Sequence, residues 1–300
     1  MLQAPPGMKI FDVHMHFPRN WEKPDEDPAP LVARLAEAAR DAGITKACLL
    51  TGGRFGPGYE RGLEIAREYE DLFIPVAVID PEEIDGAEVG KLHDMGFRGL
   101  KLIGVARDYD EPDYMGTYAA AQELGLPILF HLGVIGGGLD YSRTHWSRDP
   151  EAARFYRRMQ ERQNRMPPRD VSALRMSPLH LDTIANRFPS LRIIGAHLGN
   201  QGNYEYSASV ARWRHHVYFD MSGGTTIERH AVERGLIGSE IGIEKLVWGS
   251  DCALDQIRNH IDRFENIFDT LGLSEAQRER LWWRNAAEIY GLETPVFAEE

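Results

Sequence analysis

Cysteine is scarce in this sequence. Only Cys48 and Cys252 occur among 300 residues, which excludes a disulfide framework. Cys48 stands in an apolar run and is expected to be a buried small side chain. Cys252 follows Asp251, but no CxxC or Cys-His spacing gives it a catalytic role. Thiol chemistry is therefore not expected.

Long apolar runs and an excess of positive charge are also missing. No run approaches the roughly 18 apolar residues that cross a bilayer. The first residues lack the charged-then-apolar order of a secretory signal, so a soluble, cytoplasmic protein is expected. The formal net charge of −12 argues against a nucleic-acid or anionic-membrane partner.

The composition is that of an ordinary globular protein, with 43% hydrophobic and 27% charged residues. A chain of 300 residues is compatible with one α/β barrel domain, and we predict a single domain over residues 1–300.

Short β-rich runs alternate with segments of helical periodicity along most of the chain. This alternation predicts parallel strands joined by right-handed crossovers. Eight strands favour a closed (β/α)8 TIM barrel over an open sheet, and the first run leads into His14-Met15-His16 instead of a GxGxxG turn. The expected strands are Lys9–His16, Lys46–Thr51, Leu72–Ile79, Phe97–Ile103, Pro127–Leu132, Leu191–His197, Val217–Met221 and Lys245–Ser250.

Residues 133–177 form a long insertion after the fifth strand. Loops of this length are usually functional, and loops that follow barrel strands lie on the catalytic face. The insertion is therefore expected to lie over the mouth of the barrel, with Glu151–Asn164 as a charged surface helix. Its residues Tyr141, Arg143 and His145 are candidates for contact with an aromatic or carboxylated substrate.

His14 and His16 are two residues apart in the first strand. Residues at this spacing point to the same side of a strand, so both imidazoles are expected to project into the barrel. Two neutral imidazoles on one side form half of a tetrahedral zinc site. The pair alone is a weak signal, because histidines on a half-buried strand are usually explained by packing.

Other metal-competent side chains fall at the ends of other predicted strands. His131 ends the fifth strand, His197 ends the sixth, and Asp251 follows the eighth. Catalytic residues of this fold come from strand carboxyl ends, so these groups are expected to meet the histidine pair at one rim. Asp12 and Asp220 are possible supporting partners of the ligands.

With these residues in place, the sequence resembles the amidohydrolase superfamily. Within it, the likeness is greatest to the branch that includes aminocarboxymuconate-semialdehyde decarboxylase. It runs in order along nearly the whole chain, except in the first loop and residues 133–177. The matching stretches are Phe11–His16, Gly96–Leu102, Pro127–His131, Arg187–Pro189, Gly195–Gly199, Trp248–Asp251 and Asn285–Leu292.

The resemblance implies that His14, His16, His131 and Asp251 hold a divalent metal, most often zinc. It also implies that His197 activates or orients the attacking water. Three imidazoles and a carboxylate would leave a position open for water, whose pKa zinc brings to about 7. Asp251 is then placed to take the proton of that water as a general base.

Lys101 leaves the number of metals open. In two-metal relatives, a carbamylated lysine on the fourth strand bridges the ions, and His131 and His197 would then serve the second metal. The apolar neighbours Leu100 and Leu102 predict that Lys101 points inward. The alternative is an unmodified lysine that pairs with a carboxylate or contacts substrate. One zinc ion is favoured over two, because decarboxylase-like relatives typically hold one.

Three functions are compatible with this pattern. The first is hydrolysis of an ester, lactone or amide carbonyl by metal-activated water. The second is non-oxidative decarboxylation of an aromatic or muconate-type acid, and the third is a barrel that binds metal or ligand without turnover. The intact histidine pair favours hydrolysis, since some decarboxylases of this branch replace its first histidine with glutamate. The expected partner is a small anionic or aromatic substrate, and a homodimer, as several relatives form, stays open.

Overall fold

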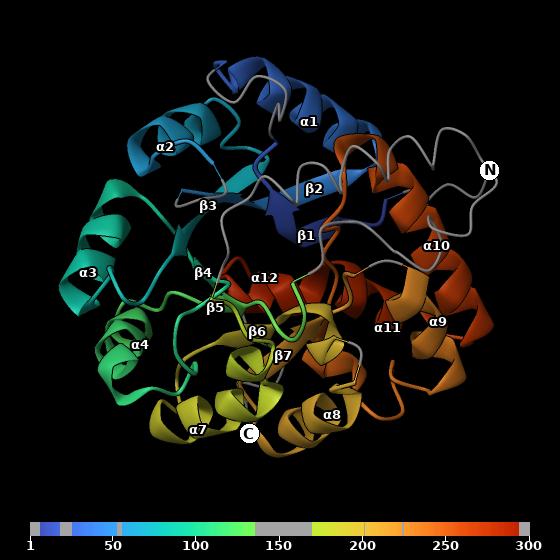
Figure 1. Cartoon of the computed structure of the whole chain (residues 1–300). Coiled ribbons are helices and arrows are strands. Elements are labelled where there is room, and N and C mark those ends of the chain that lie inside the picture. The colour runs from blue at the N-terminus through green and yellow to red at the C-terminus, as the bar shows by residue number, and fades with distance from the viewer. Residues whose placement is uncertain are drawn as a thin grey trace.

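Eight parallel strands form one sheet in which every strand pairs with its neighbour in chain order. The structure, a computed structural model, describes residues 7–18, 26–52, 56–135, 170–200, 202–223 and 225–293, without the side chains of residues 225–228. Figure 1 shows the strands at the centre, surrounded by helices. The strands are β1 (Ile10–His16), β2 (Ile44–Thr51), β3 (Phe73–Ile79), β4 (Leu100–Leu102), β5 (Ile128–Phe130), β6 (Ile193–Gly195), β7 (Val217–Asp220) and β8 (Leu246–Val247).

Backbone hydrogen bonds also join the first strand to the residues that follow the last. Val13 N donates to Trp248 O at 3.0 Å, and Asp251 N donates to His14 O at 2.8 Å. These bonds bring β1 beside the segment after β8, so the sheet curves into a barrel. The predicted (β/α)8 TIM barrel is confirmed.

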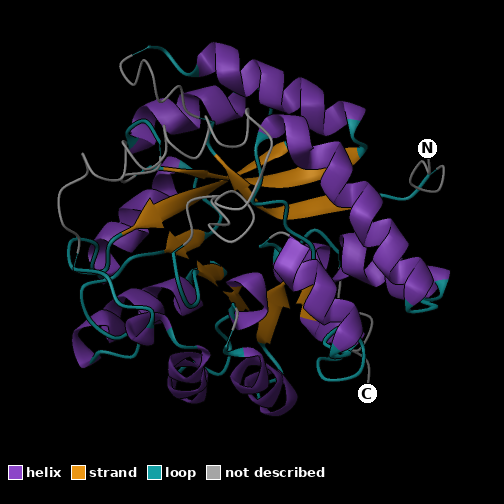
Figure 2. Cartoon of the chain, turned by 45° about the vertical axis from the view of Figure 1, so that its right-hand side comes forward, coloured by secondary structure: helices purple, strands orange, loops and turns teal. Residues whose placement is uncertain are grey.

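Helices connect the strands and cover the outside of the barrel (Figure 2). They are α1 (Ala29–Asp41), α2 (Tyr59–Arg67), α3 (Gly86–Met95), α4 (Met115–Glu123), α7 (Pro178–Arg187), α8 (Tyr204–Trp213), α9 (Thr225–Glu233), α10 (Ile257–Thr270), α11 (Glu275–Glu279) and α12 (Asn285–Ile289). The chain between β5 and α7 is long, as predicted. The expected helix Glu151–Asn164 and the candidates Tyr141, Arg143 and His145 lie outside the described residues.

Side chains alternate between two apolar clusters on either side of the sheet. The outer cluster lies between strands and helices, and the inner cluster fills the barrel. One row of paired residues crosses the four consecutive strands β3 to β6: Val78, Lys101, Leu129 and Ile194. The three apolar members belong to the inner cluster, so Lys101 points inward at the same level.

The carboxyl-terminal helices close the end of the barrel where the strands begin. A π-helical turn, Arg280–Arg284, leads into α12, and Trp283, Ala286 and Ile289 join the inner cluster. The ring of Phe11, near the start of β1, lies 5.8 Å from that of Trp283. Trp282 and Trp283 are both buried. With this end filled, an open site can form only where the strands end.

Across the part of the chain that the structure describes, no helix is both long and apolar enough to cross a membrane.

Candidate metal centre

A β-bulge in β1 sets the directions of the histidine pair. Asp12 pairs with Ala47 and Met15 with Leu49, so three steps along β1 face two steps along β2. Ala47, Leu49 and Met15 belong to the outer cluster. The shift places Asp12 on that outer side, whereas simple alternation predicted that it shares the side of His14. Asp12 still supports the site, because its Oδ1 accepts from His14 N at 2.9 Å and from Ser250 N at 3.0 Å.

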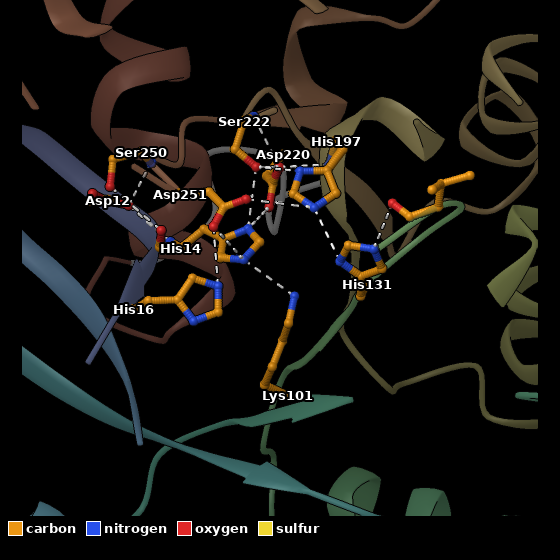
Figure 3. Close-up of polar contacts among 11 residues, drawn as sticks. Asp12, His14, His16, Lys101, His131, His197, Asp220, Ser222, Ser250 and Asp251 are labelled. Carbon is orange, nitrogen blue, oxygen red and sulfur yellow. Dashed lines mark hydrogen bonds and ion pairs between the residues drawn. The ribbon is translucent and has the colours of Figure 1, made fainter. Parts of the chain in front are cut away.

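The residues predicted at the strand ends meet at one rim of the barrel (Figure 3). His16 Nε2 lies 3.1 Å from Asp251 Oδ1, and His14 Nε2 lies 3.9 Å from the same oxygen. His197 Nε2 is 3.8 Å from Asp251 Oδ2. One potential ligand atom from each of His14, His197 and Asp251 lies within 4.8 Å of the other two. Four side chains from three places in the chain thus surround one small space.

His131 completes the group from the end of β5. Its Nδ1 lies 3.2 Å from His197 Nε2, and its Nε2 lies 3.3 Å from Val134 O. Because a carbonyl oxygen can only accept, His131 Nε2 carries the proton and Nδ1 offers a lone pair toward His197. Asn200 Nδ2 donates to the same carbonyl at 2.9 Å, which ties the loop after β5 to the turn after β6.

Asp220, at the end of β7, fixes the other two buried imidazoles. Its Oδ2 lies 2.8 Å from His14 Nδ1, and its Oδ1 accepts from His197 N at 2.8 Å. Ser222 Oγ donates to Asp220 Oδ1 at 2.6 Å and lies 2.8 Å from His197 Nδ1. The sequence suggested Asp220 as a supporting residue, but no motif or spacing pointed to Ser222.

These contacts determine where the imidazole protons lie. His14 Nδ1 donates to Asp220, so its Nε2 is free to act as a ligand. The hydroxyl hydrogen of Ser222 is used by Asp220, so His197 Nδ1 must be the donor to Ser222 Oγ. The Nε2 lone pair of His197 then faces the Nδ1 lone pair of His131. Three imidazole lone pairs and the carboxylate of Asp251 converge, and such a donor set fits a divalent cation.

Burial and neighbouring charges support the same protonation states. Burial lowers the pKa of His14 to about 4, with Lys101 lowering it further and Asp251 and Asp220 opposing the shift. Burial also lowers the pKa values of His131 and His197. Burial alone would raise the pKa of Asp251, but its contacts with His14, His16 and His197 hold it well below its usual range. At neutral pH the imidazoles of His14, His131 and His197 are therefore neutral, and the carboxylate of Asp251 is ionised.

The turns that present two of these groups have unusual backbone angles. His197 and Leu198 have φ values of 61° and 51°, and Asp251 has a φ of 41°. Residues other than glycine rarely adopt this left-handed region, and such strain concentrates at functional sites. The turn at Ala196–Gly199 directs the His197 ring back over the strand ends, which strand alternation could not predict.

Lys101 enters the same space from β4. It is fully buried, and its Nζ lies 3.3 Å from His14 Nε2 (Figure 3). Burial lowers its pKa to about 8, while the carboxylates of Asp220 and Asp251 oppose that shift. The lysine is therefore part of the cluster that the strand ends bring together.

The fold and this cluster define a (β/α)8 barrel with a metal-type site at the carboxyl ends of its strands. The sequence matches the amidohydrolase family over residues 11–292. The chain belongs to that family, as the resemblance in its motifs predicted.

Solved structures with the same fold carry different activities. A probable 2-pyrone-4,6-dicarboxylic acid hydrolase from Acinetobacter baumannii is 14% identical, with a TM-score of 0.61 over 95% of this chain and 100% of that one. A 2,6-dihydroxybenzoate decarboxylase from Rhizobium is 17% identical, with a TM-score of 0.55 over 95% and 99% of the two chains.

A dihydroxybenzoic acid decarboxylase from a Polaromonas species, solved with manganese and 2-nitroresorcinol, is 19% identical. Its TM-score is 0.57 over 95% of this chain and 97% of that one. No curated protein matches the sequence. At these identities the structural likeness establishes the fold alone, and the similar structures include a probable hydrolase as well as decarboxylases.

Proposed function

We propose that this protein is a metal-dependent hydrolase that cleaves an ester, lactone or amide of a small anionic or aromatic substrate. The observation that carries the proposal is the gathering of four imidazoles at one rim, with His14, His16 and His197 each within 3.9 Å of an Asp251 oxygen and His131 beside His197. In this proposal His14, His16, His131 and Asp251 hold one divalent metal, with zinc favoured. When bound, the metal would polarise the substrate carbonyl and lower the pKa of a water molecule.

The protein's own residues then manage the proton. Asp251 is ionised and 25% exposed, so its carboxylate can meet water at the mouth of the site. It accepts the proton of the attacking water and returns it to the leaving group, which is general base and then general acid catalysis. His197 Nε2 lies 3.8 Å from Asp251 Oδ2 and orients the same water, while Ser222 and Asp220 keep its ring in place.

The exposure of the rim favours water as the second substrate. His16 and Asp251 are 30% and 25% exposed, whereas His14 and His197 are at most 6% exposed. A hydrolase requires an entry path for water and room for a leaving group. Solvent reaches the catalytic carboxylate from this side while the supporting residues stay dry.

Non-oxidative decarboxylation is the second candidate, and Lys101 is the observation that favours it. A decarboxylase needs a cation beside the substrate carboxylate, and Lys101 brings a buried amine to the cluster. The two reactions are separated by their products. Hydrolysis releases an acid together with an alcohol or amine, whereas decarboxylation releases CO2 from a single substrate.

Metal content measured beside a substrate screen tests the proposal. Elemental analysis of the wild type and Asp251→Asn is combined with assays of ester and lactone hydrolysis and of CO2 release. About one zinc per chain, with hydrolysis lost in the variant, is the expected result. About two zinc ions per chain would bring in Lys101 as a bridge and His197 as a ligand of the second metal. No metal after zinc is supplied, together with no turnover, would refute the proposal.

A further inference from the structure

Lys101 is a buried amine whose contacts do not balance its charge. Its side chain is fully buried inside the barrel, and its contact at Nζ is with His14 Nε2 at 3.3 Å. Lys101 forms no ion pair with any residue in the described ranges. Buried ammonium groups normally require a carboxylate or several carbonyl acceptors, because removal from water is costly.

The same chain provides a comparison in Lys245, which is also buried. Lys245 Nζ donates to Arg214 O at 2.7 Å and to His215 O at 2.6 Å. Two backbone acceptors therefore satisfy that lysine within the fold. Among the described residues, Lys101 has no such pair of acceptors, so the difference lies in the surroundings of Lys101 and is not a general feature of this barrel.

The nitrogen of His14 that Lys101 contacts, Nε2, is also the one that would bind a metal. His14 Nδ1 donates to Asp220, so Nε2 has a single lone pair to share. If that lone pair binds a metal, Lys101 loses its partner. The nearby carboxylates are already engaged, because Asp220 accepts from His14, His197 and Ser222, and Asp251 contacts His16. Metal loading thus leaves Lys101 in need of a new acceptor.

We propose that this acceptor is a carboxylate of the substrate, and that Lys101 is the residue that selects an anionic substrate. The inference rests on the proposed metal-dependent function and specifies its substrate class. Because Nζ lies beside a ligand nitrogen, the carboxylate must be attached within an atom or two of the reacting carbon. The substrate class is therefore a small carbonyl compound with a neighbouring carboxylate, such as a short carboxylated lactone, ester or amide.

The test uses two probes that differ in one charge. Maleate carries two carboxylates, and maleamate replaces one of them with a neutral amide of the same shape. Binding of each to zinc-loaded wild type, Lys101→Met and Lys101→Gln is measured by calorimetry, together with zinc content. Lys91→Met, which alters a lysine that is 68% exposed, is the matched control.

The wild type and the control are expected to bind maleate about tenfold more tightly than maleamate, as one charge-assisted hydrogen bond allows. In both Lys101 variants this ratio falls to about one, while zinc content and maleamate affinity stay unchanged. Thermal melting of the two variants verifies that each is folded.

Three results would overturn the inference. The first is an unchanged probe ratio in a folded Lys101 variant. The second is loss of zinc with the lysine, which would make Lys101 a support for the metal. The third is an intact mass that is higher by one CO2, lost on acidification, which would identify a carbamylated bridge. If the wild type takes up no zinc, the proposed function fails, and the probe ratio in the metal-free protein still tests Lys101 separately.

Discussion

Asp220 holds three groups of the candidate site at once. One carboxylate oxygen faces His14 Nδ1, and the other accepts from His197 N and from the Ser222 hydroxyl. Burial would raise its pKa, but the contact with His14, whose Nδ1 donates to Oδ2, keeps the pKa below its usual range. Asp220 therefore sets the orientation and tautomer of the His14 ring from outside the proposed set of metal ligands.

We expect Asp220→Asn to weaken zinc binding about 10- to 100-fold, because an amide cannot accept from all three donors. Zinc affinity is measured by competition with a chromophoric chelator. Asp71→Asn, an exposed carboxylate that pairs with Arg40, is the control and should bind zinc as the wild type does. Equal zinc affinities in the two variants would remove Asp220 from the supporting role.

His216, at the base of β7, provides a pH prediction away from the site. Burial lowers its pKa to about 4, with help from the charges of His215 and Lys245. Its unfolded value of 6.5 is higher, so the unfolded state gains a proton first as the pH falls. The stability that depends on neutral His216 is thus present above pH 6.5 and lost progressively as the pH falls toward 4.

Between pH 7 and pH 5, this residue should account for a loss of about 2 kcal/mol in the free energy of unfolding. Urea unfolding of His216→Gln should show a pH dependence that is smaller by that amount. His93→Gln, at a side chain that is 33% exposed, should follow the wild type. A pH dependence in His216→Gln that equals that of the wild type would contradict the prediction.

At this scale, sequence reasoning found the residues that follow a pattern. Alternation indicated the histidine pair of β1, and position at a strand end indicated the other residues: His131, His197 and Asp251. The direction of the His197 ring was not predictable, because it depends on the left-handed turn after β6. Ser222 and Ser250 were not indicated, because a serine near a strand end carries no signal of its own. Their contacts depend on loops that fold back across the barrel, over separations of 25 and 238 residues.

The junction of the last strand with the first is tightly packed behind the site. A Cβ atom added to Gly249 would lie 2.7 Å from His14 Cβ and 3.4 Å from His14 N. This glycine therefore lets the segment after β8 approach the strand that bears the histidine pair.

We expect Gly249→Ala to displace His14 and to lower zinc affinity at least tenfold, since ligand position controls metal binding. It should also destabilise the fold by about 1–3 kcal/mol through overpacking. Gly90→Ala in α3 is the matched control, because a Cβ there meets nothing within 4 Å. That change should leave zinc binding intact and stabilise the helix by about 0.5–1 kcal/mol. Wild-type zinc affinity in Gly249→Ala would show that the junction tolerates the methyl group.

Helices and strands were predictable where the spacing of hydrophobic residues agrees with the residues that mark the ends of an element. All eight strands lie where the β-rich runs were, although β4, β5, β6 and β8 are only two or three residues long. The sequence did not reveal α9 or the π-helical turn before α12. It also missed the bulge in β1, since an added residue in one strand is defined by its partner strand and leaves no periodic trace.

The charge of the whole molecule bears on how an anionic substrate reaches the site. The net charge of −12 repels anions at long range, while in the proposed function the metal and Lys101 attract them only at short range. For a carboxylated substrate, kcat/KM should therefore rise several-fold between 0.01 M and 0.15 M salt, as the Debye length falls from about 30 to about 8 Å. A neutral ester assayed in parallel should show little change. A decrease with salt for the carboxylated substrate would point to a positively charged approach.

The hydrogen bond from Asp251 N to His14 O is both the closure of the barrel and a link within the site. These two residues are separated by most of the chain, and the strands between them must be in place before they meet. During synthesis, which proceeds from the amino terminus, the histidine pair emerges long before its carboxylate partner. The complete set of proposed ligands therefore exists only after β8 has left the ribosome, so capture of an ion by this set would come late, after the barrel has formed.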